Sequence, residues 1–358
     1  MSTDTLQKLS QALREVGNSE AARDRLVALC KSIEADLSGY AGSVRDDITG
    51  PIVDAMYDDD SRLRKTLADG TVFEFLYRTK IARDFLMSTP AQPDHVWEPQ
   101  TTKLLVKLCQ RGGNAVVGGA YFGDQVILMA RQLAAAGGTC HAFEPNADQL
   151  GMLRNNAKLN AVENIKSWRL GLWSDSSTQL RLVGNDSFAH AERAEASTAT
   201  DDSSFATITI DDYCAQQKLD KLSLIMLDIE GAELDVFKGA KNQLSRPAPD
   251  APNIVFEVHR HYVDWSNGLE NAEIIRMLQG FGYSVFAVRD FNSNVDMSGR
   301  PIELIPVDEV YLEGPAHGFN MVAVKDPALL QGADFSVCHH VSPKLLWHRD
   351  PALHHPLS

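Results

Sequence analysis

The stretch Asn114-Ala-Val-Val-Gly-Gly-Ala-Tyr-Phe-Gly123 decides the fold. Small apolar residues lead into a glycine-dense turn, a helical pattern runs from Gln125 to Ala136, and a second apolar run ends at Glu144. This order is typical of a strand, a tight turn, a helix and a second strand that ends in a carboxylate. The glycines let a ligand approach the backbone, and an acid about 20 residues further on binds ribose hydroxyls. The stretch therefore predicts a site for a ribose-bearing cofactor.

Apolar runs of strand length alternate with helical patterns from residue 114 to residue 290, which predicts an α/β fold with a parallel sheet covered on both faces. The predicted strands are 114–118, 139–144, 165–170, 222–228, 253–258, 283–288 and 319–325. The predicted helices between them are 123–136, 146–159, 211–217, 231–244 and 269–280. Residues 184–206 are rich in Ser, Ala, Asp and Thr, so we interpret them as a mobile or irregular insertion.

The chain divides into three predicted parts. Residues 1–94 form a mainly helical N-terminal appendage, residues 95–330 the main domain, and residues 331–358 a C-terminal tail. The helices expected within 3–38 either cover part of the main domain or form a homo-oligomer contact. Residues 290–318 are interpreted as a lid that recognises the acceptor or, equally, as a surface hairpin. The histidines of the tail lack metal-ligand spacing and are assigned no site.

Composition excludes some partners. The net charge of -14 repels phosphate backbones, so a nucleic-acid polymer is not expected. The five cysteines are scattered and odd in number, which indicates a reducing compartment. The N-terminus lacks the basic flank and apolar run of a secretion signal, and no run of about 18 apolar residues occurs. We therefore expect a cytoplasmic protein without a membrane span.

Polar candidates follow the predicted strands. Glu144 comes after the second strand, Asp228 and Glu230 after the fourth, and Glu257 and His259 after the fifth. Ligands of open parallel sheets bind beyond the carboxyl ends of the strands, so these side chains are expected in one crevice. Taken singly, each of them could instead cap a helix or satisfy a loop backbone.

The glycine turn discriminates between cofactors. A dinucleotide site needs Gly-x-Gly-x-x-Gly, whose middle glycine lets the pyrophosphate approach the backbone. In the frame Gly118 to Gly123, Ala120 holds that middle place and Tyr121 crowds the turn. A cofactor with ribose and adenine but no phosphate therefore fits better.

Several further motifs carry a family resemblance. The most specific is Leu227-Asp-Ile-Glu-Gly-Ala-Glu233, and the others are His141-Ala-Phe-Glu-Pro-Asn146, Asn156-Ala-Lys-Leu-Asn160, Thr209-Ile-Asp-Asp-Tyr213, Val236-Phe-Lys-Gly-Ala240 and Ile254-Val-Phe-Glu257. Together with the glycine turn, they resemble the FkbM family of S-adenosylmethionine-dependent methyltransferases from about residue 95 to residue 325. The resemblance implies a Rossmann-like methyltransferase fold with a mostly parallel seven-stranded sheet and helices on both faces. Its seventh strand, 319–325, would be antiparallel. The implied reaction is methyl transfer to a hydroxyl of a sugar, glycan or natural-product acceptor.

By position, the resemblance also implies the site residues. The turn would face the methionine part of the cofactor, Glu144 would hold the ribose, and adenine would lie near Leu172 and Trp173. The implied cofactor-binding set is Gly119, Ala120, Tyr121, Gly123, Glu144, Pro145, Leu172, Trp173 and Asp228, and the implied catalytic set is Asp228, Glu230, Glu257 and His259. Glu233 would also lie beside the methyl donor.

Two departures from the family pattern concern the same site. The family usually has Asp where this chain has Val117, and Lys where it has Met226. Asp124 is a candidate replacement for the lost carboxylate. His259 is the best base by its ordinary pKa, with Asp228 or Glu257 orienting the acceptor hydroxyl.

Three alternatives stay open. Asp228, Glu257 and His259, with His261, could hold a divalent metal that acidifies the acceptor. A nicotinamide-dependent oxidoreductase is disfavoured by Ala120 and by the absence of a Tyr-x-x-x-Lys pair. A catalytically silent binding protein is suggested by the two departures.

Overall fold

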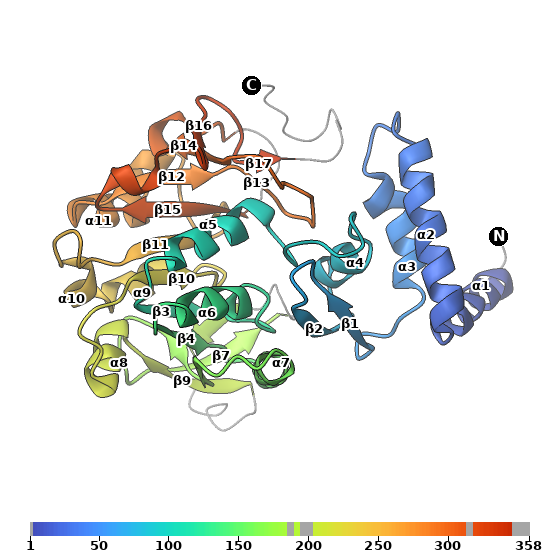
Figure 1. Ribbon diagram of the computed structural model, residues 1–358, viewed down its shortest axis with the longest axis horizontal. Helices are drawn as coiled ribbons and strands as arrows, with labels where there is room; N and C mark the ends of the chain where they lie inside the picture. Colours follow the sequence, from blue (N-terminus) through green and yellow to red (C-terminus); the bar gives the residue numbers. More distant parts are fainter. Residues whose placement is uncertain (1–2, 185–189, 194–202, 313–317, 346–358) are drawn as a thin grey trace.

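The computed structural model describes residues 3–184, 190–193, 203–312 and 318–345. A nine-stranded sheet runs through its centre in the order β16-β14-β12-β15-β11-β10-β3-β4-β5 (Figure 1). All seven predicted strands are present, as β3 Asn114–Gly118, β4 Thr139–Phe143, β5 Ile165–Trp168, β10 Leu224–Leu227, β11 Asn253–His259, β12 Ser284–Val288 and β15 Gly318–Val324. The strand β15 is antiparallel to both β11 and β12. The predicted α/β fold is confirmed, and β14 (Ile302–Pro306) and β16 (Phe335–Val337) make the sheet two strands larger than expected.

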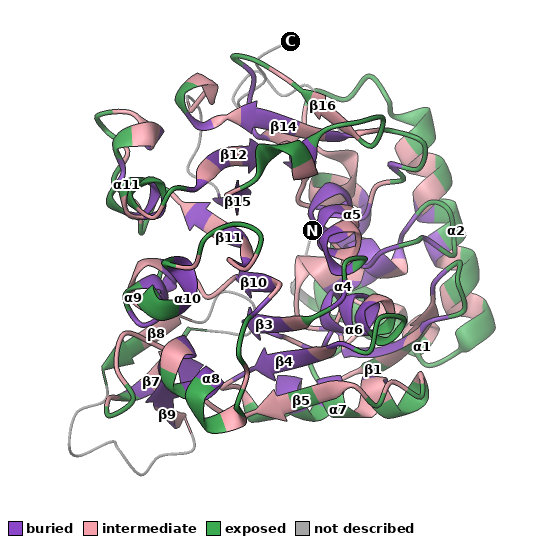
Figure 2. Cartoon of the chain, turned by 60° about the vertical axis from the view of Figure 1, so that its left-hand side comes forward, coloured by how far each residue is buried: buried purple, intermediate pink, exposed green. Residues whose placement is uncertain are grey.

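Two apolar layers cover the sheet (Figure 2). One face packs against α5 (Pro99–Cys109), α6 (Val126–Ala134) and α7 (Ala147–Leu159), and the other packs mainly against α8 (Ile210–Gln217), α9 (Glu233–Lys238), α10 (Lys241–Leu244) and α11 (Glu273–Gly280). Successive residues of a strand point to opposite faces, so Val116 and Val117 of β3 lie in different layers. Because apolar side chains point to both faces of the sheet, the central strands and their ends lie between two layers of helices.

The N-terminal region consists of helices and one hairpin. Its elements are α1 (Thr3–Gly17), α2 (Glu20–Asp36), a π-helix (Arg45–Thr49), α3 (Gly50–Asp54), the antiparallel pair β1 (Arg62–Thr66) and β2 (Val72–Leu76), and α4 (Lys80–Leu86). Asn156 and Asn160 of the Asn-Ala-Lys-Leu-Asn segment accept backbone N–H groups of Glu74 and Val72, both at 2.8 Å. This segment therefore fastens the hairpin to α7.

A second sheet flanks the first and contains β6 (Gly171–Leu172), β9 (Ser204–Ile208), β7 (Gln179–Val183) and β8 (His190–Arg193) in that order. The interpretation of 184–206 as irregular is wrong for 190–193 and 204–206, which are strand; much of the rest lies outside the described residues. Alternation of apolar residues is too short in these strands to separate them from a polar loop.

The segment 290–318 is not a single lid. Its described part contains β13 (Asp290–Phe291) and β14, which adds to the large sheet, while 313–317 lie outside the described residues. From the predicted tail, β17 (Lys344–Leu345) pairs in parallel with β13. None of the described helices combines the length and apolarity that a membrane crossing requires.

Candidate functional site

A cavity of about 440 Å³ opens at the carboxyl ends of β3, β4, β10 and β11. Ten of the predicted site residues line it, namely Gly119, Tyr121, Glu144, Pro145, Leu172, Trp173, Asp228, Glu230, Glu257 and His259. Ala120 and Gly123 do not line it, because Ala120 is packed in the apolar core and Gly123 faces Leu153 and Ile127. Ala120 and Gly123 therefore contribute to the conformation of the turn from its core side and do not contact the cavity.

The glycine turn fixes how closely two strand ends approach. Gly119 has φ +78°, and a side-chain carbon added there would lie 1.8 Å from the carbonyl oxygen of Asp228. Its N–H donates to the carbonyl of Phe143 at 3.1 Å. Only glycine therefore allows the ends of β3, β4 and β10 to meet at this point.

Glu144 is oriented by two backbone amides. Its carboxylate accepts the N–H of Tyr121 and the N–H of Asn146, each at 2.8 Å and each on a different oxygen. Tyr121 has φ 47°, a left-handed conformation that directs its amide toward the carboxylate. The two amides therefore hold the Glu144 carboxylate in a fixed orientation at the edge of the cavity.

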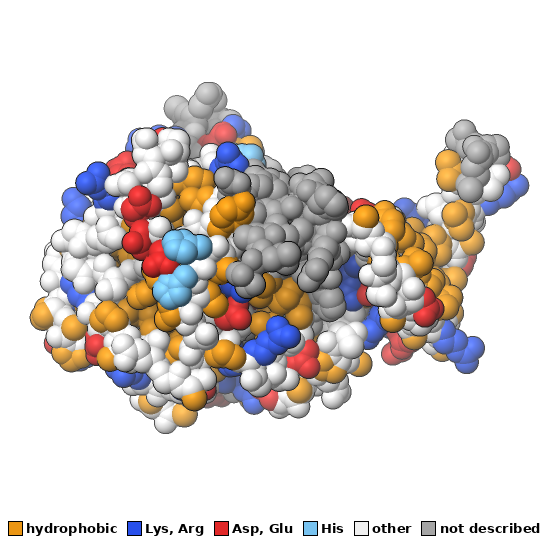
Figure 3. All heavy atoms as spheres, turned by 90° about the horizontal axis from the view of Figure 1, so that it is seen from above, with side chains coloured by type: hydrophobic (Ala, Val, Ile, Leu, Met, Phe, Trp, Pro, Cys, Tyr) orange, Lys and Arg blue, Asp and Glu red, His pale blue; other side chains and the backbone are white. Residues whose placement is uncertain are grey.

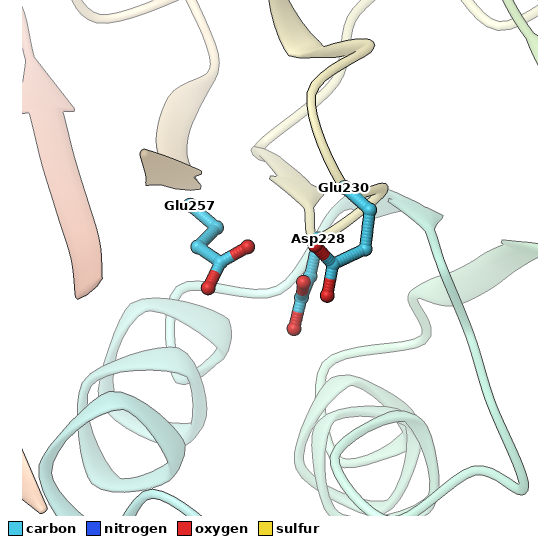
Figure 4. A group of neighbouring side chains, drawn as sticks. All are labelled: Asp228, Glu230 and Glu257. Atoms are coloured by element: carbon cyan, nitrogen blue, oxygen red, sulfur yellow. The ribbon is translucent and has the colours of Figure 1, made fainter. Parts of the chain in front are cut away.

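Three carboxylates face one another across the cavity (Figure 4). Asp228 and Glu230 follow β10, Glu257 lies in β11, and one oxygen of each lies within 4.8 Å of the others. Burial raises the pKa of Asp228 to about 6, while a hydrogen bond from Glu257 lowers it. Burial and then the charge of Asp228 raise the pKa of Glu230 to about 7 and that of Glu257 well above its usual range. Asp228 is therefore the more readily ionised of the two, and the raised pKa of Glu257 favours its protonated form.

Glu233 has a different role from the one the resemblance implies. It does not line the cavity, and its carboxylate accepts the N–H groups of Ile229 at 2.9 Å and Gly231 at 3.1 Å. It therefore holds the loop that presents Asp228 and Glu230.

His259 lines the cavity but is poorly arranged as a base. Its Nδ1 accepts the backbone N–H of His261 at 3.0 Å. Burial, followed by the charges of His261 and Lys344, lowers the pKa of His259. A neutral ring whose Nδ1 accepts a hydrogen bond carries its proton on Nε2, which then donates. Asp228 is consequently the better-placed acceptor of a proton.

The residues at the two family departures are neighbours. Val117 and Met226 pair in the β3–β10 ladder and belong to the same apolar layer, and Met226 also lines the cavity. Asp124 also lines the cavity, and burial raises its pKa to about 7. Beside it, Gln125 is 7% exposed, and its Oε1 has no hydrogen-bond partner among the described residues.

Three charged residues of the cavity, Lys80, Glu98 and Lys344, were missed from the sequence. Glu98 stands before α5 and is 5% exposed, and Lys344 comes from β17 in the predicted tail. The Trp97-Glu98-Pro99 run gives a weak signal, since an acid directly before a proline is a common helix start. No periodicity marks Lys344.

Comparison with known proteins gives one family. Residues 118–285 match the model of the methyltransferase FkbM domain. No curated protein matches the chain.

Among solved structures, the methyltransferase FkbM from Methylobacillus flagellatus KT is similar at 14% identity and TM-score 0.35, over 60% of this chain and 44% of that one. This chain thus spans less than half the length of that protein. An O-methyltransferase from Bacillus cereus in complex with SAH is similar at 15% identity and TM-score 0.33, over 63% and 81%. A SAM-dependent methyltransferase from Agrobacterium tumefaciens is similar at 10% identity and TM-score 0.36, over 74% and 69%. At such scores the likenesses carry no argument, so the assignment rests on the domain match.

Proposed function

Because this chain carries an FkbM methyltransferase domain and is an S-adenosylmethionine-dependent methyltransferase, we propose that it methylates a hydroxyl oxygen of a sugar, glycan or natural-product acceptor. The observation that carries the proposal is the group formed by Asp228, Glu230 and Glu257, which shares one cavity with the preoriented Glu144. A hydroxyl oxygen is a weak nucleophile until its proton has an acceptor, and this group offers one.

The residues present fit the cofactor. Gly119 and Glu144 leave a cradle for the ribose, while Leu172 and the ring of Trp173 provide apolar surface for adenine. Two buried polar atoms of the lining, Gln125 Oε1 and Trp173 Nε1, have no partner among the described residues. When bound, S-adenosylmethionine supplies a methyl group that is already activated by a positively charged sulfur.

The chain then aligns the acceptor and takes up its proton. We assign Asp228 as the base, because its pKa of about 6 leaves it ionised near neutral pH and a hydrogen bond from Glu257 favours its carboxylate form. The hydroxyl proton passes to the Asp228 carboxylate as the acceptor oxygen takes up the methyl group that the bound cofactor would supply. Alignment within the cavity supplies much of the rate enhancement.

A divalent cation is the alternative use of the same three carboxylates. The predicted metal set included His259 and His261, but the candidate ligand group of the described residues is Asp228, Glu230 and Glu257. Carboxylate oxygens suit Mg²⁺ or Ca²⁺, which would acidify the acceptor hydroxyl. Activity lost with EDTA and restored by Mg²⁺ selects this alternative, and activity unchanged by EDTA selects Asp228 acting alone.

Calorimetric titration with S-adenosylmethionine, S-adenosylhomocysteine and NADH tests the proposal. Saturable binding of the two sulfur compounds, followed by a 14-Da mass gain of an acceptor, is the expected result. Binding without transfer to any acceptor would favour the catalytically silent protein. Binding of NADH alone would favour the oxidoreductase.

The N-terminal helices are the proposed contact between copies of the chain. Leu6 and Leu9 of α1 and Leu29 of α2 are all more than half exposed, and hydrophobic side chains gather on this arm (Figure 3). Light scattering of Leu6→Asp/Leu9→Asp against wild type tests this contact. An unchanged mass would rule it out.

We place the protein in the cytoplasm, as the five free cysteines support.

A further inference from the structure

The far end of the cavity is built by segments on either side of the FkbM domain. Glu98 precedes residues 118–285 and Lys344 follows them, yet both line the cavity together with Glu257 and Gly318. Asp290 joins the two, since its carboxylate accepts the N–H groups of Gln100 and Thr101 in the first turn of α5. The same residue pairs with Lys344 in the β13–β17 ladder. Their placement is therefore fixed by one buried residue.

Lys344 has unused hydrogen-bonding capacity. Its ammonium donates to the carbonyl of Gly318 at 2.7 Å, and within the described residues no carboxylate lies close enough to form an ion pair with it. An ammonium has three donors, so two remain for a ligand in the cavity. Burial lowers the pKa of Lys344 to about 8, and the charges of Glu98, Glu257 and Asp290 oppose that shift. The side chain thus remains largely a cation near neutral pH.

Glu98 is held in an unfavourable conformation. Its φ is 46°, which is left-handed for a residue that is not glycine, and Asn320 donates to its carboxylate at 2.8 Å. Such strain is concentrated at functional sites. Burial, then the charges of Asp228 and Asp290, raises the pKa of Glu98 well above its usual range. Glu98 therefore presents a polar side chain, held by Asn320, to this end of the cavity.

The spacing between Lys344 and Glu257 fits two adjacent oxygens. A side-chain carbon at Gly318 would lie 2.0 Å from a Glu257 oxygen, and the Gly318 carbonyl binds Lys344. These two contacts place the Lys344 nitrogen within about 8 Å of the Glu257 carboxylate. Two neighbouring hydroxyls with a hydrogen bond of about 2.8 Å at each end span roughly 6–8 Å. Since Lys344 and Glu257 form no ion pair, they also lie more than 4.0 Å apart, and a vicinal diol would fit this range with one oxygen at Lys344 and the other beside Glu257 and Asp228.

We propose that Lys344 and Glu98 form an acceptor subsite that binds the oxygen next to the one being methylated, so that the chain selects neutral vicinal diols. This inference rests on the proposed function. An anionic acceptor is disfavoured, because the ionised Asp228 would repel it and Lys344 is the one lysine of the lining without a carboxylate partner among the described residues. The other lysine of the lining, Lys80, is ion-paired with Asp46 and Asp84.

Saturation-transfer NMR on the protein loaded with S-adenosylhomocysteine tests the subsite without turnover. The probes are methyl α-D-glucopyranoside, its uronic acid analogue and methyl α-D-mannopyranoside. We expect wild type to bind the neutral glycosides at least threefold more tightly than the uronate. Lys344→Met should weaken the neutral glycosides about tenfold or more, since a hydrogen bond to a charged group is lost. Lys344→Arg should restore part of that affinity, and the exposed Lys241→Met serves as the matched control.

The outcomes separate the two proposals. Calorimetry of S-adenosylhomocysteine should give the same affinity in wild type and Lys344→Met, which also shows that the variant is folded. Absence of that binding in wild type would defeat the proposed function. Three results would overturn the subsite alone while S-adenosylhomocysteine still binds normally. These are that no glycoside binds, that the uronate binds more tightly than the neutral glycosides, or that Lys344→Met binds the glycosides as tightly as wild type. With any glycoside that is methylated, Lys344→Met should raise KM and change kcat less than threefold.

Discussion

The two ends of the cavity are constructed differently. At the cofactor end, Gly119 and Glu144 directly follow the neighbouring parallel strands β3 and β4, and Trp173 follows β6, a few residues after β5. At the acceptor end, Glu98, Glu257 and Lys344 come from three segments that are far apart in the chain. The acceptor end can therefore be altered in the flanking segments without disturbing the sheet. If this division is real, substitutions at the two ends should affect different steps.

The largest effect is expected for Asp228→Asn, at the boundary between the two ends. Removing a general base costs about 10²–10⁴-fold in kcat, while the cofactor contacts around Glu144 are retained. Methyl transfer, measured by mass spectrometry, should therefore fall in this variant. The affinity for S-adenosylhomocysteine, measured by calorimetry, should stay at the wild-type value. In wild type, kcat/KM should rise as pH increases through about 6, because Asp228 must lose its proton to act.

His259→Gln provides the comparison for that experiment. The variant should keep the wild-type pH profile, because the Nδ1 of His259 already accepts the amide of His261. If kcat/KM of His259→Gln no longer fell at acidic pH, the histidine and not Asp228 would be the base.

A smaller effect is expected at the cofactor end. Glu144→Ala should raise the Kd of S-adenosylhomocysteine about 10–100-fold, since hydrogen bonds from the ribose to a charged group are lost. Glu144→Gln should lie between that variant and wild type, and the exposed Glu163→Ala should bind normally. The acceptor affinity measured on cofactor-loaded protein should not change. Equal loss at both ends would show that the ends are not independent.

Sequence predicted the cofactor end well because its signals are local. The glycine turn, the acid at the end of the next strand and the alternation of strands and helices all occur within short windows. The strands β3, β4, β10 and β11, and with them Glu144, Asp228 and Glu257, were placed correctly for that reason.

The acceptor end could not be predicted in the same way. The strand β17 has two residues and no periodicity, so nothing in the sequence placed Lys344 against Gly318. The apolar run in β14 was compatible with a lid until its pairing with β12 was known. The tautomer of His259 likewise depends on a backbone amide that only the folded chain supplies.

Asp124→Asn is expected to have a more selective effect. If Asp124 binds the ammonium of the cofactor's amino-acid part, the variant should weaken S-adenosylhomocysteine about tenfold. Binding of 5′-methylthioadenosine, which lacks that part, should not change. Calorimetry with both ligands gives the comparison, and equal weakening of the two would assign Asp124 to the shape of the turn instead.

The smallest effect concerns stability and uses the same variant without ligand. The pKa of Asp124 is about 7 in the folded chain and about 4 when unfolded, so the folded state binds a proton that the unfolded state lacks between these values. Stability contributed in this way is present at acidic pH and is lost as pH rises toward 7. Asp124→Asn removes the titrating group, so its Tm relative to wild type should rise by about 3 °C or more between pH 5 and pH 8. Scanning calorimetry at the two pH values measures the difference. A constant difference would mean that the folded state binds no extra proton at Asp124 in this range, which would contradict its raised pKa.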